Sequence, residues 1–318
     1  GRRRARAQGA LAAALQAYLD GRFARAEKEA QRAWEDGGVP GLAALIGARA
    51  AHQLREFPRR DQWFERAAAG DSVQAARLVS QAELALDERD FATAREALTR
   101  LHETGPRHIA TLRMLMRAER GSQNWEDVLR LASMLAKRDA ISPGIAEEYK
   151  VQAYVELLGR LATDRRAYEE RWSRIPSRDQ AIPRVAATGA RHLTALGNAA
   201  LARESVERSL AHDWSATLVT LYGELPELEM PERAREALAR IERAERWLSE
   251  HPEDPQLLAV LGRLCAAAEL WGKAQRYLEA ALSFEESRAA HLGLARLLER
   301  LGRPADAQGH FRRAAEMP

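Results

Sequence analysis

The chain has 318 residues, about twice the length of a typical single-core domain, and a formal net charge of +3. Hydrophobic residues make up 46% and charged residues 30%, which excludes a disordered chain, and no apolar run is long enough to span a bilayer. The single cysteine, Cys265, excludes an internal disulfide and a cysteine-rich metal site, and the small net charge argues against nucleic acid as a partner.

An aromatic ring recurs at a fixed interval in the first half of the chain. Successive rings are 34 residues apart, at Phe23, Phe57, Phe91 and Trp125. The positions seven residues further on hold Ala30, Phe64, Leu98 and Ala132, and a third set at the same interval holds Ala14, Ala48 and Ala82. A period of 34 is that of the tetratricopeptide repeat, in which small residues mark the place where two helices cross. The sequence therefore predicts an all-α, tetratricopeptide-type helical-hairpin solenoid wound as a right-handed superhelix.

The repeat loses its phase after residue 140. Amphipathic helices are predicted at 145–161 and 164–172, and Pro176 and Pro183 then break the pattern. Repeat-like sequence resumes at 189–202, a helix is predicted at 232–249, and two further units follow with Ala274 and Ala307 33 residues apart. We expect an N-terminal array at 1–140 with about four 34-residue units, an irregular helical segment at 141–185 and a C-terminal array at 186–318.

Motifs that carry catalysis are missing from the sequence. It contains no glycine-rich phosphate loop, no HExxH pair, no CxxC pair and no GxSxG elbow, and its eight histidines are scattered. Its carboxylates alternate with arginines, as at 233–245, in the manner of a solvated helix surface. We therefore predict no catalytic residue, no metal site and no enzymatic activity.

Arginine recurs on the face that the first helix of each repeat turns towards the concave groove. With units starting at Ala7, Gly41, Ala75, Ile109, Pro183, Pro255 and Arg288, the ninth positions are Leu15, Arg49, Glu83, Arg117, Arg191, Arg263 and Arg296. Five of these seven are arginine, whereas 49 basic residues in 318 predict about one. The predicted anion-binding groove comprises Arg49, His52, Arg113, Arg117, Arg120, Arg184, Arg191, Arg263 and Arg296, after an apolar start at Leu11, Leu15 and Tyr18. Such guanidinium groups bind carboxylates in a bidentate manner, unless neighbouring glutamates such as Glu83 or Glu299 already neutralise them.

The C-terminal repeats are more specific than the generic pattern. Leu261–Cys265, Leu270–Ala274 and Tyr277–Glu279 form a block that resembles the proteobacterial HemY family. Arg59–Asp61, Asn124–Trp125, Asp213–Trp214 and Leu221–Gly223 look similar too, so the resemblance covers essentially the whole chain.

This resemblance implies a protein of the bacterial inner membrane, with hydrophobic N-terminal spans ahead of a tetratricopeptide domain. It also implies a link to the late steps of protohaem synthesis without an established catalytic activity. We expect the present sequence to begin just after the spans, which makes Arg2, Arg3, Arg4 and Arg6 juxtamembrane and favours the cytoplasmic face.

Two functions follow as hypotheses. The first is a scaffold that binds late haem-biosynthesis enzymes, and tetrapyrrole intermediates with them, through the arginine-lined groove. The alternative is a direct carrier of haem or porphyrin, with arginines for the propionates and an axial ligand from a histidine, Cys265, Met114 or Met116.

Overall fold

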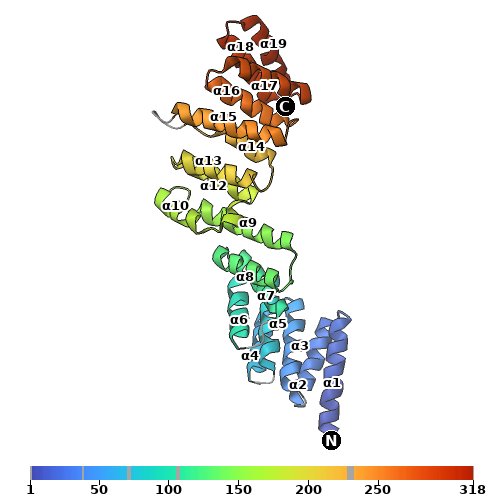
Figure 1. Ribbon diagram of the computed structural model, residues 1–318. Helices are drawn as coiled ribbons and strands as arrows, with labels where there is room; N and C mark the ends of the chain where they lie inside the picture. Colours follow the sequence, from blue (N-terminus) through green and yellow to red (C-terminus); the bar gives the residue numbers. More distant parts are fainter. Residues whose placement is uncertain (1, 38, 70–72, 105–107, 228–232, 318) are drawn as a thin grey trace. The chain divides into compact units, whose positions relative to one another are not determined.

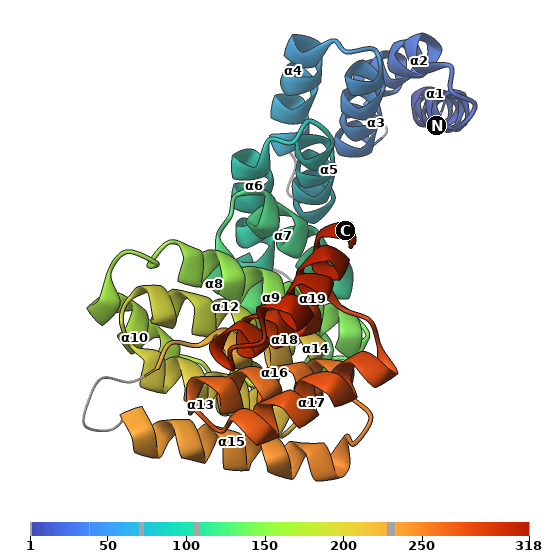
Figure 2. The ribbon, with the colours of Figure 1, turned by 90° about the horizontal axis from the view of Figure 1, so that it is seen from above.

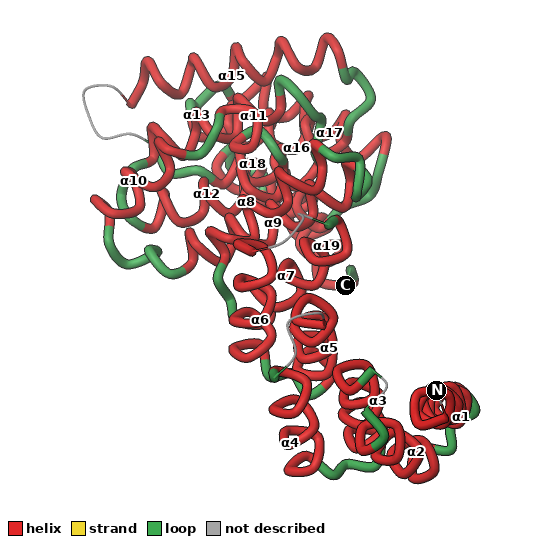
Figure 3. The backbone as a smooth tube through the Cα atoms, turned by 90° about the horizontal axis from the view of Figure 1, so that it is seen from below, coloured by secondary structure: helices red, strands yellow, loops and turns green. Residues whose placement is uncertain are grey.

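The computed structural model describes residues 2–37, 39–69, 73–104, 108–227 and 233–317, and within these ranges the chain is helical without any strand (Figure 3). It divides into two units, residues 1–153 and 154–318. The helices of the first unit are α1 (Arg2–Leu19), α2 (Phe23–Glu35), α3 (Pro40–Gln53), α4 (Phe57–Ala68), α5 (Gln74–Asp87), α6 (Phe91–Thr104), α7 (Ile109–Gly121) and α8 (Trp125–Lys137). Helix α9 (Pro143–Gly159) contains the boundary between the units.

The helices of the second unit continue the series. They are α10 (Arg165–Arg174), α11 (Ser177–Gln180), α12 (Pro183–Ala195), α13 (Ala199–Leu210), α14 (Ala216–Glu224), α15 (Arg233–Glu250), α16 (Pro255–Ala267), α17 (Trp271–Phe284), α18 (Arg288–Arg300) and α19 (Pro304–Glu316). None of the helices in the described ranges combines the length and the apolar character that crossing a membrane requires.

Four helical hairpins make up most of the first unit: α1 with α2, α3 with α4, α5 with α6 and α7 with α8 (Figure 1). Each predicted ring is the first residue of the second helix of its hairpin, namely Phe23, Phe57, Phe91 and Trp125. Ala14, Ala48 and Ala82 are completely buried in the first helices. The rings also restrict the residues packed against them. A Cβ on Gly121 of α7 would lie 2.4 Å from the Phe91 ring. The predicted all-α, tetratricopeptide-type fold is confirmed.

Each turn between paired helices contains one residue in the left-handed region, two residues before the ring. The φ angles are 75° at Gly21, 61° at Arg55, 61° at Arg89 and 57° at Gln123. The next backbone N–H then donates back to the first helix, as from Glu56 to the Ala51 carbonyl at 2.9 Å. This bond satisfies a carbonyl at the end of the first helix, which is why the turn is so short. Only one of the four turns uses glycine, so the other three hold a strained backbone conformation.

The second unit ends in two regular hairpins, α16 with α17 and α18 with α19 (Figure 2). Trp271 begins α17, in the position that the rings occupy in the first unit. Helix α17 approaches α16 closely at Gly262, where a Cβ would lie 2.5 Å from Cγ of Leu278. Glycine is therefore required at this crossing, because a larger residue would separate the helices.

The break at Pro176 and Pro183 is stabilised by buried polar side chains. The amide of Gln180 donates to the carbonyls of Trp172 at 2.7 Å and Ile175 at 3.1 Å. These carbonyls lie where α10 ends, so the side chain supplies donors that a continuing helix would have supplied. The predicted helices at 145–161 and 164–172 correspond to α9 and α10. The division at 1–140, 141–185 and 186–318 stays a prediction.

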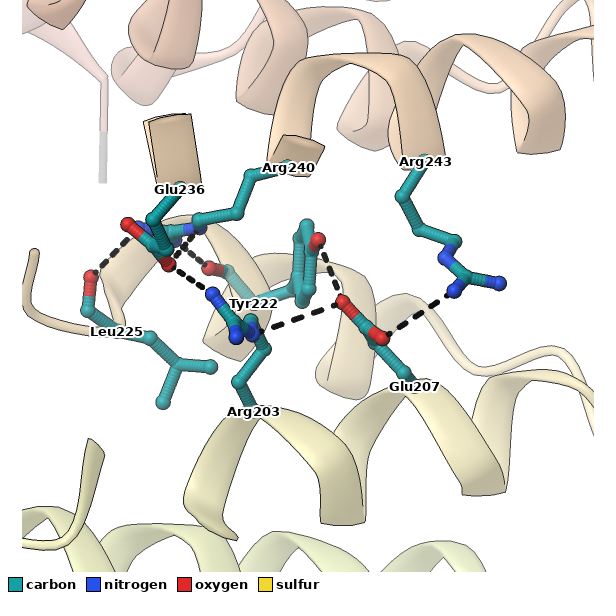
Figure 4. A network of polar contacts seen from close by, with 7 residues as sticks. All are labelled: Arg203, Glu207, Tyr222, Leu225, Glu236, Arg240 and Arg243. Atoms are coloured by element: carbon teal, nitrogen blue, oxygen red, sulfur yellow. Dashed lines mark hydrogen bonds and ion pairs between the residues drawn. The ribbon is translucent and has the colours of Figure 1, made fainter. Parts of the chain in front are cut away.

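Helix α15 corrects one expectation, because its charged residues are not all on a solvated surface. Glu236 is 7% exposed and Arg240 is 3% exposed. Arg240 donates to the carbonyls of Leu225 at 3.2 Å and of Tyr222, and its Nε lies 3.8 Å from Glu236 (Figure 4). Glu236 in turn accepts a bond from Arg203. These contacts join α15 to α13 and α14 through buried charged side chains. The alternation of carboxylates and arginines in the sequence had predicted a solvated surface there.

Candidate functional site: arginine-lined pockets

The predicted phase of the repeats agrees with the helix boundaries at four of the seven units, whereas Gly41 and Ala75 are the second residues of α3 and α5 and Ala7 lies inside α1. Ile109, Pro183, Pro255 and Arg288 were expected to start units, and they are the first residues of α7, α12, α16 and α18. The ninth residue of each of these helices is therefore an arginine: Arg117, Arg191, Arg263 and Arg296. The arginines recur at one position of the helical repeat even where the sequence period is irregular.

A pocket of 510 Å³ in the first unit brings several of the predicted residues together. Every lining residue comes from α1, α3, α5 or α7, the first helices of the four hairpins. We call it the N-terminal pocket, and its lining is Tyr18, Arg49, Gln53, Glu83, Leu84, Leu86, Asp87, Arg113, Met114 and Arg117. The first helices thus form one shared surface, as the repeat geometry predicts.

The arginines of the N-terminal pocket already have acceptors within the protein. Arg49 forms an ion pair with Glu83, and its Nε donates to the Ser80 hydroxyl at 3.3 Å. Arg113 donates to the carbonyl of Ala140, and Arg117 donates to that of Leu86 at 3.2 Å. Much of the positive charge of this pocket is therefore used to hold its own helices together.

The other predicted residues of the first unit lie outside this pocket. His52 lines a separate pocket of 230 Å³, where its Nδ1 lies 3.1 Å from Glu88 and burial lowers its pKa. Arg120 donates to Oε1 of Gln152 at 3.0 Å. Leu15 is 48% exposed and Leu11 is half-buried, and neither lines the N-terminal pocket, so only Tyr18 of the predicted apolar start joins it.

The second unit contains two further pockets with predicted arginines. The middle pocket, of 270 Å³, is lined by Arg184 and Arg191 together with residues that include Thr188, Ser215 and Thr217. The C-terminal pocket, of 400 Å³, is lined by Arg263, Ala266, Ala267, Leu278, Ala289, Leu292, Gly293, Arg296, Leu297 and Arg300. Two or more predicted arginines therefore lie in each of the three pockets.

The C-terminal pocket differs from the N-terminal pocket in its electrostatics. Among the described residues, no carboxylate lies within ion-pairing distance of Arg263 or Arg296. The Nε of Arg263 is buried and has no hydrogen-bond partner in the described part of the chain. Burial lowers the pKa of Arg263, the nearby Arg296 lowers it further, and Glu224 opposes both effects. Arg263 is thus half-buried, with a desolvated Nε that has no acceptor among the described residues and with Glu224 beyond ion-pairing distance.

One alternative that the sequence raised is confirmed at Arg49: Glu83 lies 34 residues after it and forms an ion pair with it, so the repeat itself brings the two residues together. The predicted set of groove residues left out Arg300. Arg300 follows Arg296 by one helical turn and joins the same pocket. The burial of Arg263 had no sequence signal, because it depends on how α14 packs against α16.

The sulfur-bearing side chains predicted as possible haem ligands differ in their burial. No group of three or more histidine, cysteine or carboxylate side chains is placed there to hold a metal ion. Cys265 is completely buried, and burial raises the pKa of its thiol to about 11, so no thiolate is presented. Met116 is buried as well, whereas Met114 lines the N-terminal pocket.

Comparison with known proteins agrees with the sequence resemblance. The sequence-family model described as HemY protein N-terminus matches residues 1–55 of this chain. Protein HemY of Escherichia coli K12 is 25% identical over 96% of this chain and 76% of its own length, and the same values hold for Protein HemY of Shigella flexneri. The chain resembles the HemY family. The residues matched by the HemY N-terminal model include Tyr18 and Arg49 of the N-terminal pocket.

Two solved structures match most of this chain at low sequence identity and low TM-score. Yeast Tom70 is 14% identical over 98% of this chain and 69% of its own, with a TM-score of 0.34. PilF of Pseudomonas aeruginosa is 12% identical over 98% of this chain and 90% of its own, with a TM-score of 0.29. The helical-repeat fold is established by the hairpins of this chain itself.

Proposed function

We propose that this protein is a non-catalytic scaffold that binds partner proteins through the arginine-bearing surface of its first helices. The observation that carries the proposal is the recurrence of the predicted arginines in the N-terminal, middle and C-terminal pockets. Concave surfaces that concentrate one sign of charge attract partners of the opposite sign and orient them. Partners with acidic surfaces fit this arrangement best.

The resemblance to HemY supports a narrower version of the proposal. In it the partners are enzymes of late haem biosynthesis, gathered at the cytoplasmic face of the inner membrane. The first turns of α1 carry exposed Arg2, Arg3, Arg4 and Arg6, which suit the anionic headgroups of that leaflet. Tetrapyrrole intermediates passing between bound enzymes would meet the same arginines through their carboxylates.

Crosslinking in membranes, followed by affinity capture of the full-length protein, tests the proposal. We expect haem-biosynthesis enzymes to be captured, and capture to fall when Arg49, Arg117, Arg191 and Arg263 are replaced together by glutamine. Circular dichroism must show that the variant keeps its helices. Replacing Arg312, an exposed arginine outside all of the pockets described above, is the matched control. Unchanged capture by a folded quadruple variant would show that the arginine surface does not bind partners.

Direct binding of haem or porphyrin is the second candidate, and the N-terminal pocket is the observation that favours it. Met114 offers a thioether there, beside Tyr18 and the guanidinium groups of Arg113 and Arg117. Titration with haemin should then produce a Soret shift that Met114→Ala abolishes. The absence of a shift at micromolar protein would remove this function while leaving the scaffold proposal intact.

A further inference from the structure

The arginines of the N-terminal and C-terminal pockets differ in whether the protein supplies them with hydrogen-bond acceptors. In the N-terminal pocket Arg49, Arg113 and Arg117 each bond to an acceptor of the protein. In the C-terminal pocket neither Arg263 nor Arg296 has an acceptor among the described residues. An anion entering the N-terminal pocket would have to displace existing bonds, whereas the C-terminal pocket has donors to offer at once.

Arg263 is held in place by close packing around its side chain. A Cβ on Gly223 of α14 would lie 2.8 Å from Nη2 of Arg263, and a Cβ on Gly293 of α18 would lie 3.8 Å from its Cγ. The absence of a side chain at Gly223 therefore leaves room for the guanidinium group, whereas a Cβ at position 293 would make only ordinary contact with the stem. Arg263 is half-buried and its buried Nε lacks an acceptor among the described residues, which costs free energy that a bound anion would offset.

The rest of the C-terminal pocket is aliphatic. Leu278, Leu292 and Leu297 line it together with small alanines and Gly293, and no aromatic ring is among the lining residues. Arg300 lies at the pocket as well, with its guanidinium carbon 6.0 Å from the centre of the Trp271 ring. A pocket of 400 Å³ with these walls suits a carboxylate that is flanked by aliphatic groups.

We infer that the C-terminal pocket binds an acidic peptide segment of the partner protein, with a glutamate or aspartate side chain held by Arg263 and Arg296 and an adjacent aliphatic residue packed on Leu278 and Leu292. This inference rests on the proposed scaffold function and names its binding subsite. The aliphatic walls favour a singly charged carboxylate over a phosphate, whose dianion would remain poorly solvated there. The absence of stacking rings in the lining argues against a nucleic acid strand.

The affinity test uses the full chain and an N-acetylated, C-terminally amidated peptide, Leu-Glu-Leu-Glu-Leu. Isothermal titration should show binding at least tenfold tighter than for the Leu-Gln-Leu-Gln-Leu counterpart, and Arg263→Met should abolish that difference. Arg312→Gln is the control and should leave it unchanged. Equal binding of the two peptides, or full affinity in Arg263→Met, would overturn the inference. Tight binding of the glutamine peptide only when its C-terminus is a free acid would also overturn it, because the chain terminus would then be the ligand.

A stability measurement separates a binding role from a structural one. Methionine preserves much of the arginine stem without the desolvated charge, so Arg263→Met should melt at the same temperature as the wild type or higher while losing the peptide. A structural role would lower the melting temperature instead. Should Arg263→Met unfold, Arg296→Gln at its exposed position gives the same affinity test. Capture of partners from membranes without peptide binding would discard this subsite and leave the scaffold function standing.

Discussion

Replacing Arg240 by methionine should loosen α15 from the helices beneath it. The arginine is almost completely buried, donates to the carbonyls of Tyr222 and Leu225, and lies beside the buried carboxylate of Glu236 (Figure 4). Methionine fills a similar volume but leaves both carbonyls without this donor and removes one of the two guanidinium groups near Glu236. Breaking a buried pair from one side destabilises by about 3–5 kcal/mol.

Hydrogen exchange followed by mass spectrometry measures this effect where it occurs. A loss of about 3 kcal/mol corresponds to a roughly hundredfold faster exchange of the α15 amides. Helices α1 to α8 provide an internal reference, because their exchange should not change.

Arg243→Met is the matched control on the same helix. Arg243 is 44% exposed and its Nη2 lies 3.7 Å from Glu207, so its ion pair should contribute less than about 0.5 kcal/mol. Equal protection of α15 in Arg240→Met and the wild type would refute the idea that the buried charges hold this helix. Equal losses in both variants would show that burial does not distinguish them.

Three further changes test other features of the fold. Arg89→Gly should stabilise the protein by about 0.5–1 kcal/mol in urea denaturation, because Arg89 has a φ of 61°, whereas Arg89→Ala should gain nothing. Gly189→Ala should cost about 1–3 kcal/mol, since its Cβ would lie 2.3 Å from the Trp172 ring, and an unaffected melting temperature would contradict this packing; Gly144→Ala meets nothing within 4 Å and should be neutral. Burial and the neighbouring imidazole of His291 lower the pKa of His310 in the folded chain, so the unfolded chain binds more protons and the stability falls as the pH drops below 6.5. The His310→Gln variant should show a smaller fall in melting temperature between about pH 7 and 5. The same dependence of melting temperature on pH in variant and wild type would exclude His310 as its cause.

The fold could be predicted because the repeat places the same kind of residue in the same environment each time. Phe23 and Phe57 both begin a second helix, so a ring spacing in the sequence becomes a hairpin spacing in space. The turn conformation could not be predicted in the same way. Arg55 and Arg89 are in the left-handed region, where a glycine would have been the expected signal, because the turn geometry overrides the local preference.

The positions of the pocket arginines could be predicted from the sequence, whereas their pairing with carboxylates could not. Helix phase predicted Arg49 and Arg263 as pocket residues, and they line the N-terminal pocket of the first unit and the C-terminal pocket of the second. Whether each arginine was neutralised depended on its neighbours in space. Glu83 reaches Arg49, whereas the neighbours of Arg263 in the packing include Gly223 and Gly293. Pairing depends on distances of a few ångströms, which a pattern of residue types does not specify.

Within both units the principal contacts join helices that are adjacent or next but one along the chain. Loops that close over short stretches lose little entropy, so such a protein can form its contacts while it is being synthesised. Helices α1 and α2 can pair before the later repeats leave the ribosome, and each new hairpin then adds to a surface that already exists. Production of this protein should therefore tolerate slow translation, and shortened chains that end between hairpins should retain the structure of the repeats they contain.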